Sequence, residues 1–80
     1  MTFGQFFKKQ RLKNKVTQRE LASYLEVTPQ YINNVENGRS VMSPDKVRLA
    51  SEYMEIPLSV FINKLVSEYR QSLTRKMQAP

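Results

Sequence analysis

Apolar residues recur at intervals of three and four along most of this chain, the spacing that gathers side chains on one face of an α-helix. Together with helix start and stop signals, the pattern predicts five helices and no strand. The first helix is expected to begin at Phe3, because Thr2 and Gln5 have the spacing of a capping box, and to fade near Asn14. Gly4 lowers its helix propensity slightly. The residues expected to share its inner face are Phe3, Phe7, Arg11 and Leu12.

Two short helices are predicted next along the chain. A second capping box, Thr17 with Glu20, precedes a helix over about Gln18–Leu25. A threonine followed by proline then marks the start of a helix over about Pro29–Asn37, because proline at the first helical position has no N–H to leave unpaired. The apolar residues expected to pack these two helices together are Leu21, Ala22, Leu25, Val27, Ile32 and Val35.

The second half of the chain is predicted to form two more helices. Ser43 before proline repeats the start signal and predicts a helix over Pro44–Met54. Its inward residues are expected to be Val47, Ala50 and Met54. A last helix begins at Leu58, nothing stops it before Gln78, and residues 78–80 are expected to fray. Its apolar stripe consists of Leu58, Phe61, Ile62, Leu65, Val66, Tyr69, Leu73 and Met77.

Composition narrows the classes of function. The 80 residues suffice for one compact domain with an ordinary hydrophobic fraction of 40%. The absence of cysteine excludes disulfides and thiolate metal sites, and the absence of histidine removes the commonest general base and metal ligand. No nucleophile–base pair is apparent, so we expect neither an enzyme, nor a cofactor, nor a metal. Without a membrane-length apolar run or a signal-peptide pattern, the expected location is the cytoplasm.

The net charge of +6 is concentrated near the N-terminus. Six basic residues precede the first acid, Glu20: Lys8, Lys9, Arg11, Lys13, Lys15 and Arg19. Taken alone, such a cluster fits a charged, solvated surface as well as it fits a binding site. Beside a DNA-reading motif it would neutralise phosphates.

The outer face of the predicted helix over Pro29–Asn37 carries polar side chains, namely Gln30, Tyr31, Asn33, Asn34 and Asn37. Side-chain amides can pair with the N6 and N7 atoms of adenine in the major groove. Glu36 is the one acid in this helix. The face is therefore suited to base reading, although amide enrichment alone is a weak signal.

Three stretches, Gln18–Ala22, Val27–Ile32 and Val35–Arg39, resemble the Cro and phage-repressor class of helix-turn-helix domains, also called the Xre family. Arg11-Leu12 and Leu49-Ala50 also fit. The resemblance implies an all-α fold, a five-helix lambda-repressor-like bundle with a helix-turn-helix and, here, an extended C-terminal helix. It implies a DNA-binding domain over residues 1–66. The C-terminal helix extension over residues 67–80 lies beyond the resemblance and is a candidate dimerisation element because of its apolar stripe.

The resemblance also implies roles for individual residues. Those expected to read bases are Thr28, Pro29, Gln30, Asn33 and Asn34, with Pro29 restricted to contact with a thymine methyl group. Those expected to hold phosphates are Gln18, Asn37 and Arg39, joined by Lys8, Lys9 and Lys13 from the basic cluster. Arg11 and Glu36 resemble an internal salt bridge of the family. The residues themselves support this pairing, since Arg11 shares an apolar face with Phe7 and a buried arginine needs a carboxylate.

One position departs from the family pattern. Glu26 stands in the turn where the family most often has glycine, a residue that suits a left-handed backbone. A glutamate in that conformation costs about 1–2 kcal/mol. The sequence thus predicts either a different turn or a tolerated strain.

The apolar stripe of the last helix is longer than a five-helix core needs. Phe61, Ile62 and Leu65 are expected to complete the core. The residues beyond them would expose an apolar seam and are assigned to a two-fold homodimer interface: Val66, Tyr69, Leu73 and Met77. A protein partner on the same helix is an alternative. Membrane-surface binding is disfavoured because the polar face mixes basic residues with Glu68.

The sequence therefore favours a sequence-specific regulator that binds double-stranded DNA, a repressor acting as a homodimer on an inverted-repeat operator, of prokaryotic or phage origin. Two alternatives remain open. One is the antitoxin of a toxin–antitoxin pair, which shares such a domain and binds its own operator. The other is a protein-interaction adaptor that has kept the fold, which the amides of Gln30, Asn33 and Asn34 argue against.

Overall fold

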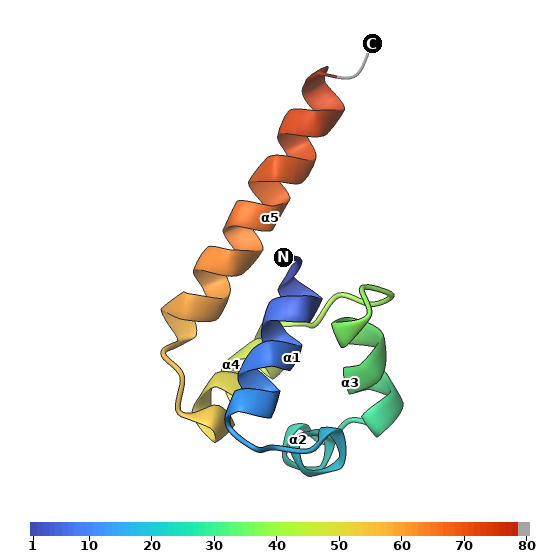
Figure 1. The fold of residues 1–80 in the computed structure, drawn as a ribbon, viewed down its shortest axis with the longest axis vertical. Helices are drawn as coiled ribbons and strands as arrows, with labels where there is room; N and C mark the ends of the chain where they lie inside the picture. The colour runs from blue at the N-terminus through green and yellow to red at the C-terminus, as the bar shows by residue number, and fades with distance from the viewer. Residues whose placement is uncertain (79–80) are drawn as a thin grey trace.

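The computed structural model describes residues 1–78, and within this range the chain forms five helices and no strand (Figure 1). They are α1 (Phe3–Lys13), α2 (Gln18–Leu25), α3 (Pro29–Glu36), α4 (Pro44–Met54) and α5 (Leu58–Gln78). The predicted all-α class is confirmed, and α3 ends one residue earlier than predicted, with Asn37 as its C-cap. Fraying at residue 78 is not seen because Gln78 is still helical, and the rest of that expectation, residues 79–80, lies outside the described range.

Side-chain caps explain where the first three helices begin. Both predicted capping boxes are formed: the Thr2 hydroxyl accepts from the N–H of Gln5, and the Thr17 hydroxyl from that of Glu20. The Thr28 hydroxyl caps α3 by accepting from the N–H of Tyr31. The start of α4 is different, because the Ser43 side chain makes no capping bond there.

The core lies where all five helices meet. Its buried apolar residues are Phe3, Phe7, Leu21, Ala22, Leu25, Ile32, Val35, Met42, Val47, Ala50, Met54 and Phe61. Phe61 joins α5 to this core, with its ring centroid 5.7–6.1 Å from those of three α1 phenylalanines, Phe3, Phe6 and Phe7. These tilted and edge-on contacts fix the N-terminal half of α5 against α1.

Two residues predicted to face the core are exposed instead. Leu12 is 56% exposed and Ile62 is 45% exposed, although Leu65 does pack against the core. Each follows directly after a fully inward residue, Arg11 or Phe61, and one step along a helix turns a side chain by about 100°. The periodicity therefore predicted the helices correctly but assigned too many residues to their buried faces.

The C-terminal half of α5 extends away from the rest of the molecule (Figure 1), giving overall extents of 44 × 24 × 21 Å. One polar contact also ties α5 to α1: the Glu68 carboxylate accepts from the backbone N–H of Phe3 at 2.8 Å, at the N-terminus of α1. The division into residues 1–66 and 67–80 stays a prediction. Among the described helices, none is both long and apolar enough to cross a membrane.

Candidate nucleic-acid interface

The α2–α3 pair is joined by the short turn Glu26–Thr28. Glu26 has φ 57° and ψ 43°, so the left-handed turn is kept although the residue is not glycine. Its backbone N–H donates to the carbonyl oxygens of Ala22 and Ser23, and the N–H of Val27 also donates to Ala22. These bonds satisfy the last carbonyls of α2 and orient the start of α3.

Glu26→Gly is expected to raise the free energy of unfolding by about 1 kcal/mol, because the left-handed conformation costs a side-chain residue about 1–2 kcal/mol and glycine much less. The Glu26 side chain is exposed, so little contact is lost. Urea denaturation monitored by circular dichroism measures the change. Glu26→Ala is the control, since it removes the charge but keeps the Cβ atom; a lower stability of Glu26→Gly than of wild type would contradict the strain.

A buried ion pair joins α1 to the end of α3. Arg11 Nε donates to Glu36 Oε2 at 2.6 Å and Arg11 Nη2 to Glu36 Oε1 at 3.0 Å, while Arg11 Nη1 donates to the carbonyl of Val16 at 2.8 Å. The two side chains are only 7% and 1% exposed. This two-pronged geometry is the one in which an arginine–carboxylate pair is strongest. It also removes the one acid of α3 from the helix surface.

A chain of amides continues from this pair to the surface. Gln18 Nε2, at the start of α2, donates to Glu36 Oε1 at 3.1 Å and to Asn33 Oδ1 at 3.4 Å. Asn37 Nδ2 donates to Asn33 Oδ1 at 3.2 Å and to the Asn33 carbonyl at 2.9 Å. The first turn of α2 and the outer face of α3 are thereby held at a fixed separation.

This network assigns Asn33 a second role that sequence reasoning missed. Its side-chain oxygen is occupied by Gln18 and Asn37, which leaves its amide nitrogen as the group able to reach outward. The signal that could have found it is the spacing of three and four residues between Asn33, Glu36 and Asn37, which places them on one side of α3.

The exposed surface of α3 begins at its first turn, where Thr28, Pro29 and Gln30 are all exposed. Gln30 Nε2 donates to Asn34 Oδ1 at 2.9 Å. The bond leaves Gln30 Oε1 as an acceptor and Asn34 Nδ2 as a donor. An adenine edge in the major groove offers the complementary pair, the N6 donor and the N7 acceptor. Together the two side chains can therefore do what a single bidentate amide does.

Tyr31 does not belong to this surface, although the sequence placed it there. Its hydroxyl accepts from the backbone N–H of Ser43 at 3.3 Å, and its ring packs against the core. The contact holds the Ser43 backbone just before α4. The N–H of Lys46, which a serine side chain would cap, donates instead to the Ser43 carbonyl at 3.0 Å. The remaining outward side chains of α3 and its cap are consequently amides, Thr28 and Pro29.

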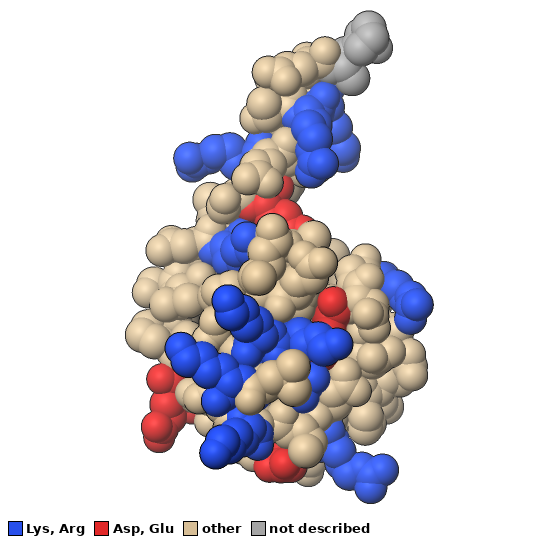
Figure 2. Space-filling model, in the orientation of Figure 1, with Lys and Arg blue, Asp and Glu red and all other residues tan. Residues whose placement is uncertain are grey.

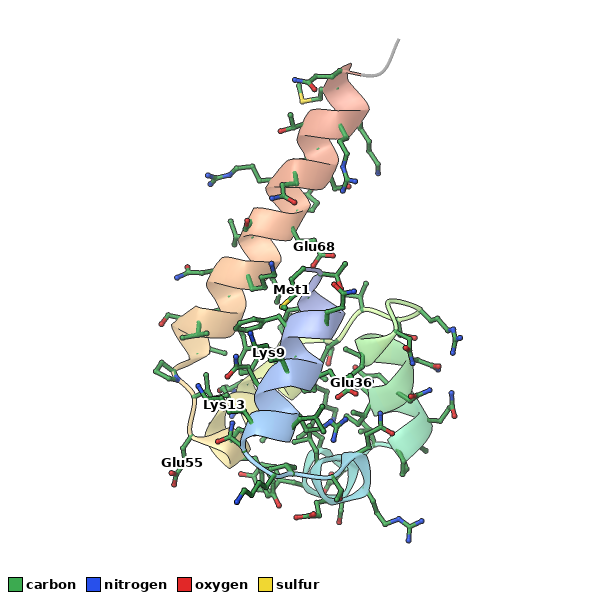
Figure 3. All side chains as sticks on the ribbon, in the orientation of Figure 1. Met1, Lys9, Lys13, Glu36, Glu55 and Glu68 are labelled. Carbon is green, nitrogen blue, oxygen red and sulfur yellow. The ribbon has the colours of Figure 1, made fainter. Side chains whose placement is uncertain are left out.

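The basic residues divide into two sides of α1. Lys and Arg gather over α1 on the face that Figure 2 shows. Gly4 and Arg11 mark the side of α1 that faces α3, and Lys8 lies about 40° from Gly4 around the helix. Lys9 and Lys13 lie about 140–180° from it, on the side away from α3, whereas Glu36 lies between the two helices (Figure 3). Arg39 is exposed in the loop after α3.

The sequence matches a known family, and the fold matches a solved structure. The family model described as Helix-turn-helix matches residues 7–61. The crystal structure of the clp gene regulator ClgR from Corynebacterium glutamicum superposes with a TM-score of 0.72 and 22% sequence identity, covering 94% of this chain and 81% of that one. No curated protein sequence gives a significant match. The structural likeness, at this identity, concerns the fold.

Proposed function

The chain belongs to the Xre/Cro-like helix-turn-helix family of DNA-binding regulators, and from this premise we propose that it is a sequence-specific repressor. It would bind double-stranded DNA as a homodimer on an inverted-repeat operator and block transcription by occupying it. Binding requires no cofactor and no chemistry in this proposal. Because the ligand is DNA, the proposed place of action is the cytoplasm of a prokaryotic cell, from a chromosomal or phage gene.

The observation that carries the proposal is the composition of the outer face of α3. The one acid of α3, Glu36, is buried against Arg11, so no carboxylate of this helix repels a phosphate backbone. The exposed Gln30–Asn34 pair then offers one acceptor and one donor to a base edge. A surface made only for solubility would more often carry lysine and glutamate.

Phosphate contacts would surround this surface. Gln18 lies at the N-terminus of α2, where backbone N–H groups favour an anion, and its amide nitrogen already ties it to α3. Asn37 and Arg39 follow α3 and would hold the backbone on the far side of the groove. Of the three lysines assigned to phosphate, Lys8 lies on the side of α1 that faces α3, while Lys9 and Lys13 would add attraction at longer range.

Selection from a random duplex pool at moderate salt tests the proposal directly. Enrichment of an inverted repeat, with half-sites about one DNA turn apart, is expected. Enrichment of a single half-site would keep the DNA reader and discard the homodimer. If only weak, salt-sensitive binding without sequence preference were found, the chain would not be a sequence-specific regulator.

Gln30→Ala and Asn34→Ala are each expected to lose about 1–3 kcal/mol of discrimination at one A·T pair of the half-site, the value of a good bidentate contact. Fluorescence anisotropy with the selected duplex and a duplex changed at that pair measures this loss. The two losses should not add, because the side chains act as one hydrogen-bonded unit.

Arg39→Ala supplies the contrasting control for this experiment. A phosphate-binding residue should weaken binding to all duplexes alike and reduce the salt slope by about 1. Gln71→Ala, an exposed amide on α5, should change neither quantity. If wild type and Gln30→Ala discriminated between the two duplexes by the same ratio of affinities, Gln30 would not belong to the base-reading set.

A further inference from the structure

Five of the six exposed large apolar residues of α5 form one straight stripe, and Val60 lies outside it. Its members are Ile62, Val66, Tyr69, Leu73 and Met77, and they are 41–83% exposed. At about 100° per residue, they are all the positions between 62 and 77 that fall within an arc of about 80°. Ile62, which failed to join the core, belongs to this stripe. A monomer would leave this continuous apolar surface in water, which is typical of an interface.

The C-terminal half of α5 has little of its own chain to pack against. Every residue from Leu73 to Gln78 is exposed, whereas Phe61 and Leu65 hold the first half to the core. Isolated helices shorter than about 12–15 residues are marginal in water. A helix that continues this far beyond the core of its own chain is expected to pack against another surface.

The positions of the stripe fit a second copy of α5 that runs in the opposite direction. A two-fold interface requires that, if one residue faces a second, the second faces the first. Ile62 with Met77 and Val66 with Leu73 have the same midpoint, between Tyr69 and Arg70. With the axis there, each of these four side chains meets an apolar side chain of the other copy, and the two Tyr69 side chains lie beside the axis.

Charge decides between the two directions of pairing. The last nine described residues contain Arg70, Arg75 and Lys76 and no acid. A parallel pair would gather six positive charges at one end and align two helix dipoles side by side. An antiparallel pair places the three charges of each copy at opposite ends and opposes the dipoles.

A groove of about 440 Å³ borders the stripe near the same midpoint. Its wall on α5 is formed by Leu65, Glu68, Tyr69 and Ser72. Its opposite wall includes Val41 of the α3–α4 loop, which is 87% exposed. Val41 and Tyr69 thus add exposed apolar area beside the stripe at the place where the two copies would meet.

We infer that two copies of this chain pair through antiparallel α5 helices about an axis near Tyr69, with Leu73 and Met77 of each copy covering Val66 and Ile62 of the other. The inference rests on the homodimer of the proposed function and specifies its geometry. Five stripe residues and their flanks are fewer than the 20–30 residues per partner of a standard interface. The dimer should accordingly be weak in isolation, with a dissociation constant of about 1–100 μM.

Cysteine cross-linking tests the direction, because the chain has no cysteine of its own. Two differently tagged variants, Val66→Cys and Leu73→Cys, are mixed and oxidised. The protein concentration is about 100 μM, the upper end of the expected dissociation constants. A disulfide between the two variants is expected, with little between two copies of Val66→Cys, because a disulfide requires Cα atoms about 4.4–6.8 Å apart. Dominant like-with-like products would overturn the inference in favour of a parallel pair.

Leu73→Glu tests whether the stripe makes the dimer, with Gln71→Glu as the matched control on the opposite side of α5. Leu73→Glu should raise the dimer dissociation constant in sedimentation equilibrium at least about 100-fold, because symmetry buries two carboxylates. Gln71→Glu should leave it nearly unchanged. Circular dichroism verifies that both variants keep the helical content of wild type. A monomeric wild type at 100 μM, or equal effects of the two variants, would overturn the inference and leave the stripe to another protein or a lipid surface.

Duplex selection separates this result from the proposed function. Leu73→Glu should still enrich the half-site while losing the inverted repeat. A wild-type monomer that enriches a half-site would contradict the pairing alone. An antiparallel dimer that enriches no sequence would contradict the regulator alone.

Discussion

Arg11→Ala is expected to lower the free energy of unfolding by about 3–5 kcal/mol, the usual cost of leaving a buried charge without its partner. Glu36 would keep one hydrogen bond, from Gln18, in a site that is 1% exposed to solvent. A domain of 80 residues has roughly 4–12 kcal/mol in total. The variant should therefore lose about a quarter or more of the total stability at 25 °C, as measured by urea denaturation with circular dichroism.

The matched control is Arg48→Ala, which breaks an Arg–Glu pair of the same chemistry on the surface of α4. The Arg48 and Glu52 side chains are 51% and 49% exposed, so this variant should change stability by no more than about 0.5 kcal/mol. Replacing both buried partners, Arg11→Met with Glu36→Met, should recover more than half of the loss, because no unpaired charge remains. An Arg11→Ala variant as stable as Arg48→Ala would show that the buried Arg11–Glu36 pair contributes no more to stability than the exposed pair.

The same ion pair links stability to DNA binding. Glu36 accepts from Arg11 and Gln18, and Gln18 donates in turn to Asn33 on the outer face of α3. A folded variant of Arg11 would therefore lose the fixed position of Gln18 beside α3. Its affinity for the selected operator should fall even at temperatures where it is fully folded.

The helix positions could be predicted from sequence because their determinants are local. Capping boxes act over three residues, and proline fixes its own φ angle, so Thr2, Thr17 and Pro29 each mark a helix start without reference to the rest of the chain. The left-handed conformation of Glu26 could be predicted only from the family pattern, because nothing local in the sequence requires that conformation.

The side-chain directions at the candidate site could not be predicted in the same way. The orientation of Tyr31 depends on the backbone of Ser43, twelve residues away, and the role of Asn33 depends on Gln18 in another helix. The helical period predicts which face of the helix a side chain lies on, but not whether a residue at the edge of that face is buried. It therefore placed Ile62 and Leu12 in the core, where a neighbouring inward residue already occupied the space.

Gly4→Ala is expected to destabilise the protein, which is the opposite of what helix propensity predicts. In an exposed helix, alanine is more stable than glycine by about 1 kcal/mol. Gly4, however, is buried where α1 crosses α3, and an added Cβ atom would lie 2.3 Å from the carbonyl oxygen of Val35 and 2.8 Å from that of Glu36. Both atoms belong to the backbone of α3, so no side-chain rotation can relieve the contact.

The two helices must separate to admit the methyl group, which would also strain the Arg11–Glu36 bonds between them. Overpacking of this kind typically costs about 1–3 kcal/mol, and contact with backbone on one side places Gly4→Ala at the upper end, about 3 kcal/mol. At about 4–8 °C per kcal/mol for a domain of this size, the melting temperature should fall by about 12–24 °C.

Gly38→Ala is the control that separates crowding from backbone strain. Gly38 has φ +76° but open space around its Cβ position, so alanine there should cost only the left-handed strain, about 1–2 kcal/mol. Gly4→Ala should be the more damaging of the two, although Gly4 is helical and Gly38 is not. A Gly4→Ala variant that melts at or above the wild-type temperature would mean that α1 and α3 do not approach each other this closely.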